Sequence, residues 1–205
     1  MKRTILLIIC YSALQFYSDF FLITEDVIYD SLIDQLAYDR VSNIVAQNRS
    51  WRWISYSLVI CAILIKLLII SGCFAIGNLL LNGKTHFKIL FSIVSLSEFI
   101  FLIPAVIKIF WFSVVKTDYT LQDLQYFPPL SILNLFDTGL LEHWLIYPLQ
   151  LLNLFELAYW CILAWQLKDI LNKDFASSLG FVASTYGVGL LLWVIFVMFL
   201  TVSLT

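Results

Sequence analysis

The sequence is poor in charged residues, and it carries no excess of positive charge. Only 13% of its 205 residues are charged, against about 25% in a typical soluble domain, and 61% are hydrophobic. A water-soluble fold of this length could not hide so much apolar surface, so lipid is the expected solvent for much of the chain. The formal net charge of −2 provides no basic stripe, which argues against a nucleic-acid partner.

Patterns for metal binding and catalysis are also missing. The sequence contains no P-loop, no G-x-S-x-G and no H-E-x-x-H motif. Its two histidines are far apart, and its four cysteines form no C-x-x-C pair and match no zinc spacing. These cysteines all lie in apolar runs, where free thiols pack as small apolar groups: Cys10, Cys61, Cys73 and Cys161. We therefore expect no cofactor, no metal site and no enzymatic activity.

What the sequence does contain is five apolar stretches long enough to cross a bilayer, which takes roughly 20 helical residues. The five stretches are residues 4–23, 53–81, 87–115, 144–167 and 179–203. In lipid each backbone must satisfy its own hydrogen bonds, so each stretch should be helical. The first is expected to stay as an uncleaved anchor, because its apolar run is too long for a signal peptide. The prediction is one domain over residues 1–205, an all-α integral membrane protein with a five-helix bundle.

The distribution of Lys and Arg predicts the orientation of the chain. With the N-terminus inside, the short inner loops are residues 82–86 and 168–178, and the outer loops are residues 24–52 and 116–143. Basic residues on the inner side are Lys2, Arg3, Lys84, Lys88, Lys168 and Lys173, and those on the outer side are Arg40, Arg49, Arg52 and Lys116. Because cytoplasmic loops carry an excess of Lys and Arg, we predict the N-terminus inside and the C-terminus outside.

The outer loops contain signals for short helices. From Glu25 to about Val45, apolar residues recur at helical spacing, and Thr24 can cap this stretch. We predict an amphipathic helix that lies on the outer surface or continues the first span. The segment "SWRWISY", residues 50–56, is typical of an interfacial aromatic belt. In the second outer loop, Thr120 and Asp123 have capping-box spacing.

Apart from Lys88, which lies at the inner end of its span, five acidic or basic residues fall inside the predicted spans, where a charge at helix centre costs about 2.5–3.5 kcal/mol on insertion scales. They are Asp19, Lys66, Glu98, Lys108 and Glu156. Counting helical rise divides them into a midplane cluster of Lys66, Glu98 and Glu156 and an outer pair of Asp19 and Lys108. Gln150 and Asn153 precede Glu156 at three-residue steps and should share its inward face.

The midplane cluster has two acids for one base, which leaves three interpretations open. Two carboxylates cannot both ionise easily beside one lysine, so one of Glu98 and Glu156 is expected to be protonated. The cluster can be a static lock between helices, or part of a proton- or ion-coupled path. A basic residue from an outside partner can instead pair with the second acid.

The last apolar stretch has no Asp, Glu, Lys, Arg or His, and a stripe of small residues begins just before it. Ala176, Gly180 and Ser184 are four apart, as are Ala183 and Gly187. Small residues at this spacing let helix backbones approach closely. The stripe predicts either internal packing or the face of a homodimer.

Three segments together resemble the Yip-domain family of small multi-pass membrane proteins, with the closer likeness to its bacterial members. They are "SLSEFIFLIPAV" (95–106), "PLSILNLF" (129–136) and "LLNLFELAYW" (151–160). The resemblance covers about residues 53–203. It implies a bacterial cytoplasmic (inner) membrane location and no catalytic residues. Eukaryotic members are linked to Rab-type GTPases, but only residues 1–3 precede the first predicted span here.

Two functions from different classes fit these features. The first is a non-enzymatic membrane scaffold or accessory subunit that associates with the bilayer and with a membrane-protein partner or a second copy. The second is a transporter or permease subunit that uses the midplane cluster for proton or ion coupling.

Overall fold

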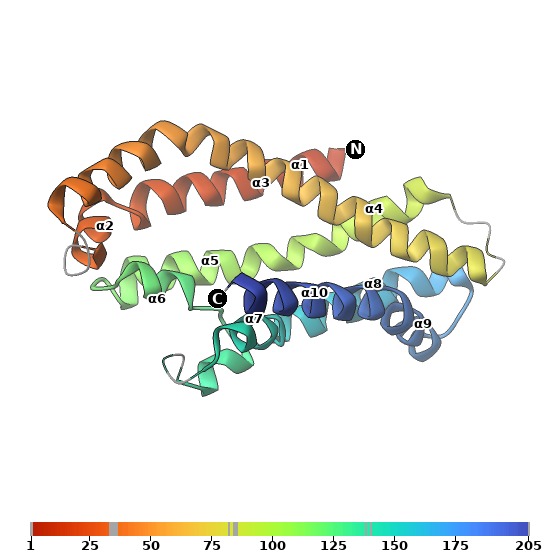
Figure 1. Cartoon of the computed structure of the whole chain (residues 1–205). Helices are drawn as coiled ribbons and strands as arrows, with labels where there is room; N and C mark the ends of the chain where they lie inside the picture. The colour runs from red at the N-terminus through yellow and green to blue at the C-terminus, as the bar shows by residue number, and fades with distance from the viewer. Residues whose placement is uncertain are drawn as a thin grey trace.

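The computed structural model describes residues 2–32, 37–81, 83, 86–137, 139 and 141–204. In these residues the regular structure is helical, with one isolated antiparallel bridge between Ser131 and Asn153 and no strand. Figure 1 shows the long helices lying roughly along one axis, with α2 (Glu25–Leu32) and α6 (Leu121–Gln125) at one end and α9 (Phe175–Val182) at the other. The predicted all-α class is confirmed.

Four helices in the described part of the chain are long and apolar enough to cross a membrane. The first consists of α1 (Lys2–Tyr17) and η1 (Ser18–Leu22), and the second is α3 (Tyr38–Leu80). The third consists of α4 (Phe87–Ser97), η2 (Glu98–Phe101), α5 (Leu102–Phe110) and η3 (Trp111–Val115). The fourth consists of α9, η6 (Ala183–Gly187) and α10 (Val188–Leu204). These helices contain nearly all of the predicted spans 4–23, 53–81, 87–115 and 179–203. They support a membrane protein.

Pro104 accounts for a change of helix type within the third of these helices. Proline has no N–H, so it cannot donate an α-helical hydrogen bond to the carbonyl of Ile100. The backbone tightens into a 3₁₀ turn over Glu98–Phe101, and Pro104 then lies in the first turn of α5, where proline is tolerated. Glu98 therefore stands at a junction between two helix types.

The predicted fourth span, residues 144–167, is not one continuous helix. α7 (His143–Leu151) ends before Leu152, and α8 (Leu154–Leu171) starts a new helix. The side chain of Asn153 caps α8 by accepting from the backbone N–H of Glu156 at 2.8 Å. The chain therefore contains an interrupted helix at the place where the sequence predicts an unbroken span.

Residues 130–132, from the predicted second outer loop, pair with the backbone at this interruption. The amide of Ile132 donates to the carbonyl of Leu152 at 3.0 Å, and the amide of Leu154 donates to the carbonyl of Leu130 at 3.2 Å. Leu130 has φ of 54°, a left-handed conformation that is uncommon outside glycine. Non-helical backbone at membrane depth requires such protein partners, because lipid offers none.

Residues 24–52, predicted as a loop with an amphipathic helix over about residues 25–45, contain α2 and the start of α3. α2 is capped by Thr24, whose hydroxyl accepts from the amide of Val27 at 3.4 Å. Residues 33–36 lie outside the described part of the chain, as do residues 82, 84 and 85 of the predicted inner loop. From Tyr38 the chain is already in α3, which continues without a break to Leu80. The predicted amphipathic stretch is thus divided between α2 and the start of α3.

Two apolar clusters hold the helices together. The larger cluster joins α3, α4, α8 and the α9–η6 segment, and its fully buried members include Phe74, Tyr159 and Val182. The smaller one packs Leu22 and Phe112 against Leu124 of α6. The larger cluster surrounds the polar residues described next.

Candidate functional site

The three predicted midplane residues lie at similar distances from the helix ends that the sequence predicts to be on the inner side. Counted at 1.5 Å per residue, Lys66 is about 21 Å from the end of α3, Glu98 about 17 Å from the start of α4 and Glu156 about 22 Å from the end of α8. A bilayer has a hydrocarbon core about 30 Å thick and is about 40–45 Å thick with its head groups. These distances are about half of the full bilayer thickness, and the three residues lie at a similar level along the bundle.

Lys66 and Glu98 form an ion pair between two helices. The Nζ of Lys66 lies 2.5 Å from the Oε1 of Glu98, and it also lies 4.3 Å from the ring centre of Phe101. The Glu98 side chain is 2% exposed, whereas the Lys66 side chain is 43% exposed. The pair fastens α3 to the 3₁₀ turn η2, and its basic partner stands at the surface of the bundle.

Glu156 does not pair with Lys66, the basic residue at a similar depth. Its Oε1 accepts from the Nε1 of Trp160 at 2.9 Å and from the hydroxyl of Tyr186 at 2.7 Å. Asn153 caps the backbone of the same turn, and its Nδ2 donates to the carbonyl of Gln150 at 2.9 Å. Among the described residues, neither recorded ion pair includes Glu156. The predicted cluster is thus two separately bonded units, the Lys66–Glu98 pair and Glu156 with Trp160 and Tyr186.

Tyr159 stands between these two units. Its ring lies 5.0 Å from that of Phe101 and 5.5 Å from that of Tyr186, between ring centres. Its fully buried hydroxyl lies near Glu98 without meeting hydrogen-bond geometry. The aromatic rings therefore connect the Lys66–Glu98 pair to the Glu156 unit across the bundle.

The predicted outer pair, Asp19 and Lys108, forms no ion pair within the described ranges. Asp19 instead accepts from the Nε2 of Gln15 at 2.9 Å, one helical turn before it. Asp19 also lines a cleft of about 270 Å³ together with Arg52 of α3. Lys108 is half-buried in α5. Similar depth therefore does not bring the two groups into contact.

The predicted small-residue stripe is mostly exposed. Ala176, Gly180, Ala183 and Ser184 lie on the surface, and a Cβ added at Gly180 would meet nothing within 4 Å. Gly187 alone faces inward, where an added Cβ would lie 2.7 Å from the ring of Trp160. The internal-packing interpretation therefore fits Gly187, and the other four positions leave a face open to lipid or a partner.

The close helix approach occurs at residues that the sequence interpretation omitted. A Cβ at Gly77 would overlap the side chain of Thr185, and one at Gly189 would lie 3.2 Å from the Sγ of Cys73. Cys73 and Gly77 are four apart on α3, and Thr185 and Gly189 are four apart on the facing helix. This small-residue spacing on both helices is what permits the approach.

Trp160 and Tyr186 were also missed as partners of Glu156. Trp160 is four residues after Glu156, a spacing at which helix side chains meet, so the sequence contains a signal for it. Tyr186 is distant in the chain and belongs to the π-helical turn η6. Its pairing depends on how the helices pack, which no local pattern reveals.

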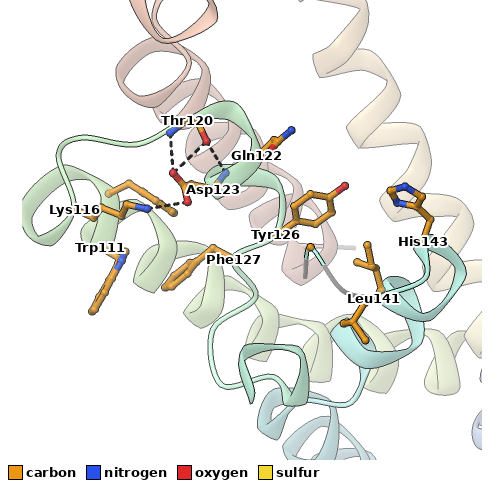
Figure 2. Close-up of a pocket in the computed structure, with 12 residues that line it drawn as sticks. Trp111, Lys116, Thr120, Gln122, Asp123, Tyr126, Phe127, Leu141 and His143 are labelled. Atoms are coloured by element: carbon orange, nitrogen blue, oxygen red, sulfur yellow. Dashed lines mark hydrogen bonds and ion pairs between the residues drawn. The ribbon is translucent and has the colours of Figure 1, made fainter. Parts of the chain in front are cut away.

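An open pocket of about 550 Å³ lies at the end of the bundle that contains α6, next to η3 (Figure 2). Lys116 pairs with Asp123 at 2.8 Å on one side, and Tyr126 and His143 lie on another. Thr120 and Asp123 form the predicted capping box at the start of α6. The lining of the pocket therefore contains aromatic side chains and the Lys116–Asp123 ion pair, whose charges cancel.

Acidification is expected to loosen α6 through Asp123. The hydrogen bond from Lys116 lowers the pKa of the Asp123 carboxyl below its ordinary value. The hydrogen bond from the amide of Thr120 is the next largest cause of this lowering. A lowered pKa in the folded state means that the stabilisation is present above about pH 4–5 and is lost as the pH falls through the folded pKa. The side chains of the pair are 44% and 35% exposed and are screened by solvent, so the loss should not exceed about 1 kcal/mol.

Amide hydrogen exchange in α6, corrected for the intrinsic effect of pH, measures this loosening. Protection of the Asp123 and Leu124 amides should fall between pH 6 and pH 3 in the unmodified protein. The Asp123→Asn variant, which lacks the charge, should begin with low protection and change little. Parallel pH profiles in the two proteins would contradict the assignment to Asp123.

Comparisons with known proteins find no matching family model, no matching curated protein and no matching solved structure. The resemblance to the Yip-domain family therefore stays a prediction. Within the residues that the structure describes, no group of three or more His, Cys, Asp or Glu side chains could hold a metal ion. The midplane residues are consequently the main basis for a functional proposal.

Proposed function

We propose that this chain is a non-enzymatic membrane scaffold or accessory subunit that binds another membrane-embedded chain along α3. The observation that carries the proposal is the half-exposed Lys66, whose side chain is 43% exposed near the middle of a helix long enough to cross the membrane. Charged groups at this depth normally face a bundle interior or a water-filled cavity. A neighbouring helix over α3 would enclose Lys66 in such an interior.

The position of the Lys66 head group supports a covering partner. Lysines near helix ends extend toward the head groups, but here the ammonium is held by Glu98 and Phe101. The adjacent side chains of Ile65 and Ile69 are exposed and apolar, as expected of a helix-packing surface. The exposed small-residue stripe on α9 and η6 offers a second face on which a copy of this chain or another subunit could pack.

A second candidate is a transporter subunit, and the interrupted helix favours it. Discontinuous helices in transporters place half-helix ends near substrate and ion sites at the midplane. Here α8 begins at such an interruption, with Glu156 in its first turn. On this alternative, Glu98 and Glu156 would exchange a proton or bind an ion during transport.

Purification of tagged protein in a gentle detergent tests the accessory-subunit proposal. We expect a second membrane protein, or a second copy, in stoichiometric amount. The double variant Lys66→Met with Glu98→Leu removes both charges and leaves neither unpaired. It should reduce the co-purified partner at least tenfold while the variant still elutes as a folded species. A folded variant that retains its partner in full would contradict the role of α3.

We extend the proposal to the location of the chain. The Lys and Arg distribution favours an N-terminus inside and a C-terminus outside, and the resemblance to bacterial Yip-domain proteins favours the cytoplasmic membrane of a bacterium. Modification of single cysteines added at Lys173 and Asp118 by a membrane-impermeant reagent distinguishes the two sides. Labelling at Asp118 alone in intact cells is the expected result.

A further inference from the structure

A small cleft opens between the first span and the outer part of α3. It has a volume of about 270 Å³. Its polar lining consists of Gln15, Asp19, Asn48, Arg52 and Ser55, and Trp51 completes one side. The residues come from α1 and η1 on one wall and from α3 on the other.

Charges of opposite sign line the cleft without pairing. Asp19 and Arg52 are both half-buried, yet neither belongs to an ion pair recorded for the described residues. Asp19 accepts a hydrogen bond from Gln15, which orients its carboxylate. Both groups also lie near the hydroxyl of Tyr56. A ligand with one negative and one positive group could therefore contact both residues at once.

The cleft lies at the depth of the outer head groups. Arg52 is about 42 Å from the inner end of α3, counted at 1.5 Å per residue. A bilayer with its head groups is about 40–45 Å thick. Trp51 is 58% exposed and Trp53 is 67% exposed, as expected of indole rings in the interfacial layer. A lipid head group is thus the ligand that this position meets most often.

We propose that the cleft binds the head group of a zwitterionic phospholipid with a primary ammonium, the phosphoethanolamine type. Arg52 holds the phosphate, because a guanidinium matches phosphate oxygens in charge and geometry. Asp19 accepts from the ammonium, and Ser55 and Asn48 donate to the remaining phosphate or ester oxygens.

The lining also distinguishes among head groups. A quaternary ammonium has no N–H to donate to Asp19, and a single Trp is not the aromatic cage that such a group prefers. An anionic head group gains less, because Asp19 cancels the charge of Arg52 within the cleft. The expected order of affinity is therefore phosphoethanolamine first, with phosphocholine and phosphoglycerol lipids below it.

Native mass spectrometry of the full chain in detergent tests this order. The protein is titrated with phosphatidylethanolamine, phosphatidylcholine and phosphatidylglycerol that carry identical acyl chains. We expect phosphatidylethanolamine to bind about tenfold more tightly than either of the others, which is the effect of one charge-assisted hydrogen bond. Equal affinity for all three lipids would overturn the proposal.

Variants show whether the cleft is responsible. Arg52→Gln and Asp19→Asn should each remove the preference for phosphatidylethanolamine, about a tenfold loss. Arg49→Gln is the matched control, because Arg49 is an exposed arginine on the same helix that does not line the cleft. If Arg52→Gln does not fold, Ser55→Ala and Arg52→Lys replace it, and a preference unchanged in both would overturn the proposal.

Soluble competitors separate a lipid site from a site for free phosphate. Phosphoethanolamine and inorganic phosphate are each added at millimolar concentration to the lipid-bound protein. A lipid site predicts that neither releases the bound lipid, because neither supplies the acyl chains. Release by inorganic phosphate alone would identify a phosphate site and overturn the assignment to a lipid.

Discussion

Replacing Glu98 with alanine should destabilise the folded protein by about 2.5–3.5 kcal/mol, the cost of an uncompensated charge at the centre of a membrane helix. The ammonium of Lys66 would lose its counter-charge, and only the Phe101 ring would remain beside it. Unfolding of the purified protein by sodium dodecyl sulfate, followed by circular dichroism, measures the change. This variant is expected to have one of the two largest effects on stability.

Glu25→Ala is the matched control for this experiment. Glu25 is an exposed glutamate in the first turn of α2, outside the four spanning helices. Its removal should change stability by less than about 0.5 kcal/mol, as surface substitutions usually do. Equal stability of the Glu98→Ala and Glu25→Ala variants would mean that the Lys66–Glu98 ion pair does not hold α3 to η2.

Gly77→Ala should be the second strongly destabilising change. The added methyl group would overlap the side chain of Thr185 and would lie 3.0 Å from the ring of Phe181. Thr185 cannot turn away freely, since its hydroxyl donates to the carbonyl of Phe181 at 2.6 Å. Helices α3 and η6 must therefore separate, and overpacking of this kind typically costs about 1–3 kcal/mol. The same detergent unfolding measurement applies.

Two glycines provide controls for this variant, and Thr185 provides a rescue. Neither Gly72 nor Gly180 has an atom within 4 Å of an added Cβ, so alanine at either position should be neutral or stabilise its helix by about 0.5–1 kcal/mol. Thr185→Gly should restore stability to the Gly77→Ala protein by removing the overlapping group. Losses of similar size at all three glycines would contradict the close approach at Gly77.

The level of each residue along the bundle could be predicted from the sequence. Helical rise is nearly constant, so counting residues from helix ends brings Lys66, Glu98 and Glu156 to one depth. Counting does not say which way a side chain points around its helix. For this reason, counting does not reveal that Glu156 accepts a hydrogen bond from Tyr186 of η6. It also does not reveal that Asp19 lines a cleft with Arg52. These partners depend on the packing of distant segments.

The break between α7 and α8 is a second feature that the sequence alone did not predict. Pro148 and Asn153 are local signals for a helix end, but they lie within an apolar run that satisfies the length of a span. The hydrogen bonds that make the interruption tolerable come from Leu130 and its neighbours in the preceding loop. Since that pairing is non-local, hydropathy alone could not distinguish an interrupted helix from a continuous one.

The central claim is that Lys66 and Glu98 act as one interhelical lock in the middle of the membrane domain. A double-mutant cycle with Lys66→Met, Glu98→Leu and their combination measures the coupling of these two residues directly. The account predicts that Glu98→Leu alone is strongly destabilising and that the double variant recovers at least about 1 kcal/mol of the loss, since it leaves no unpaired charge. Additive losses, equal within about 0.5 kcal/mol, would show that the two residues contribute independently and would contradict the lock.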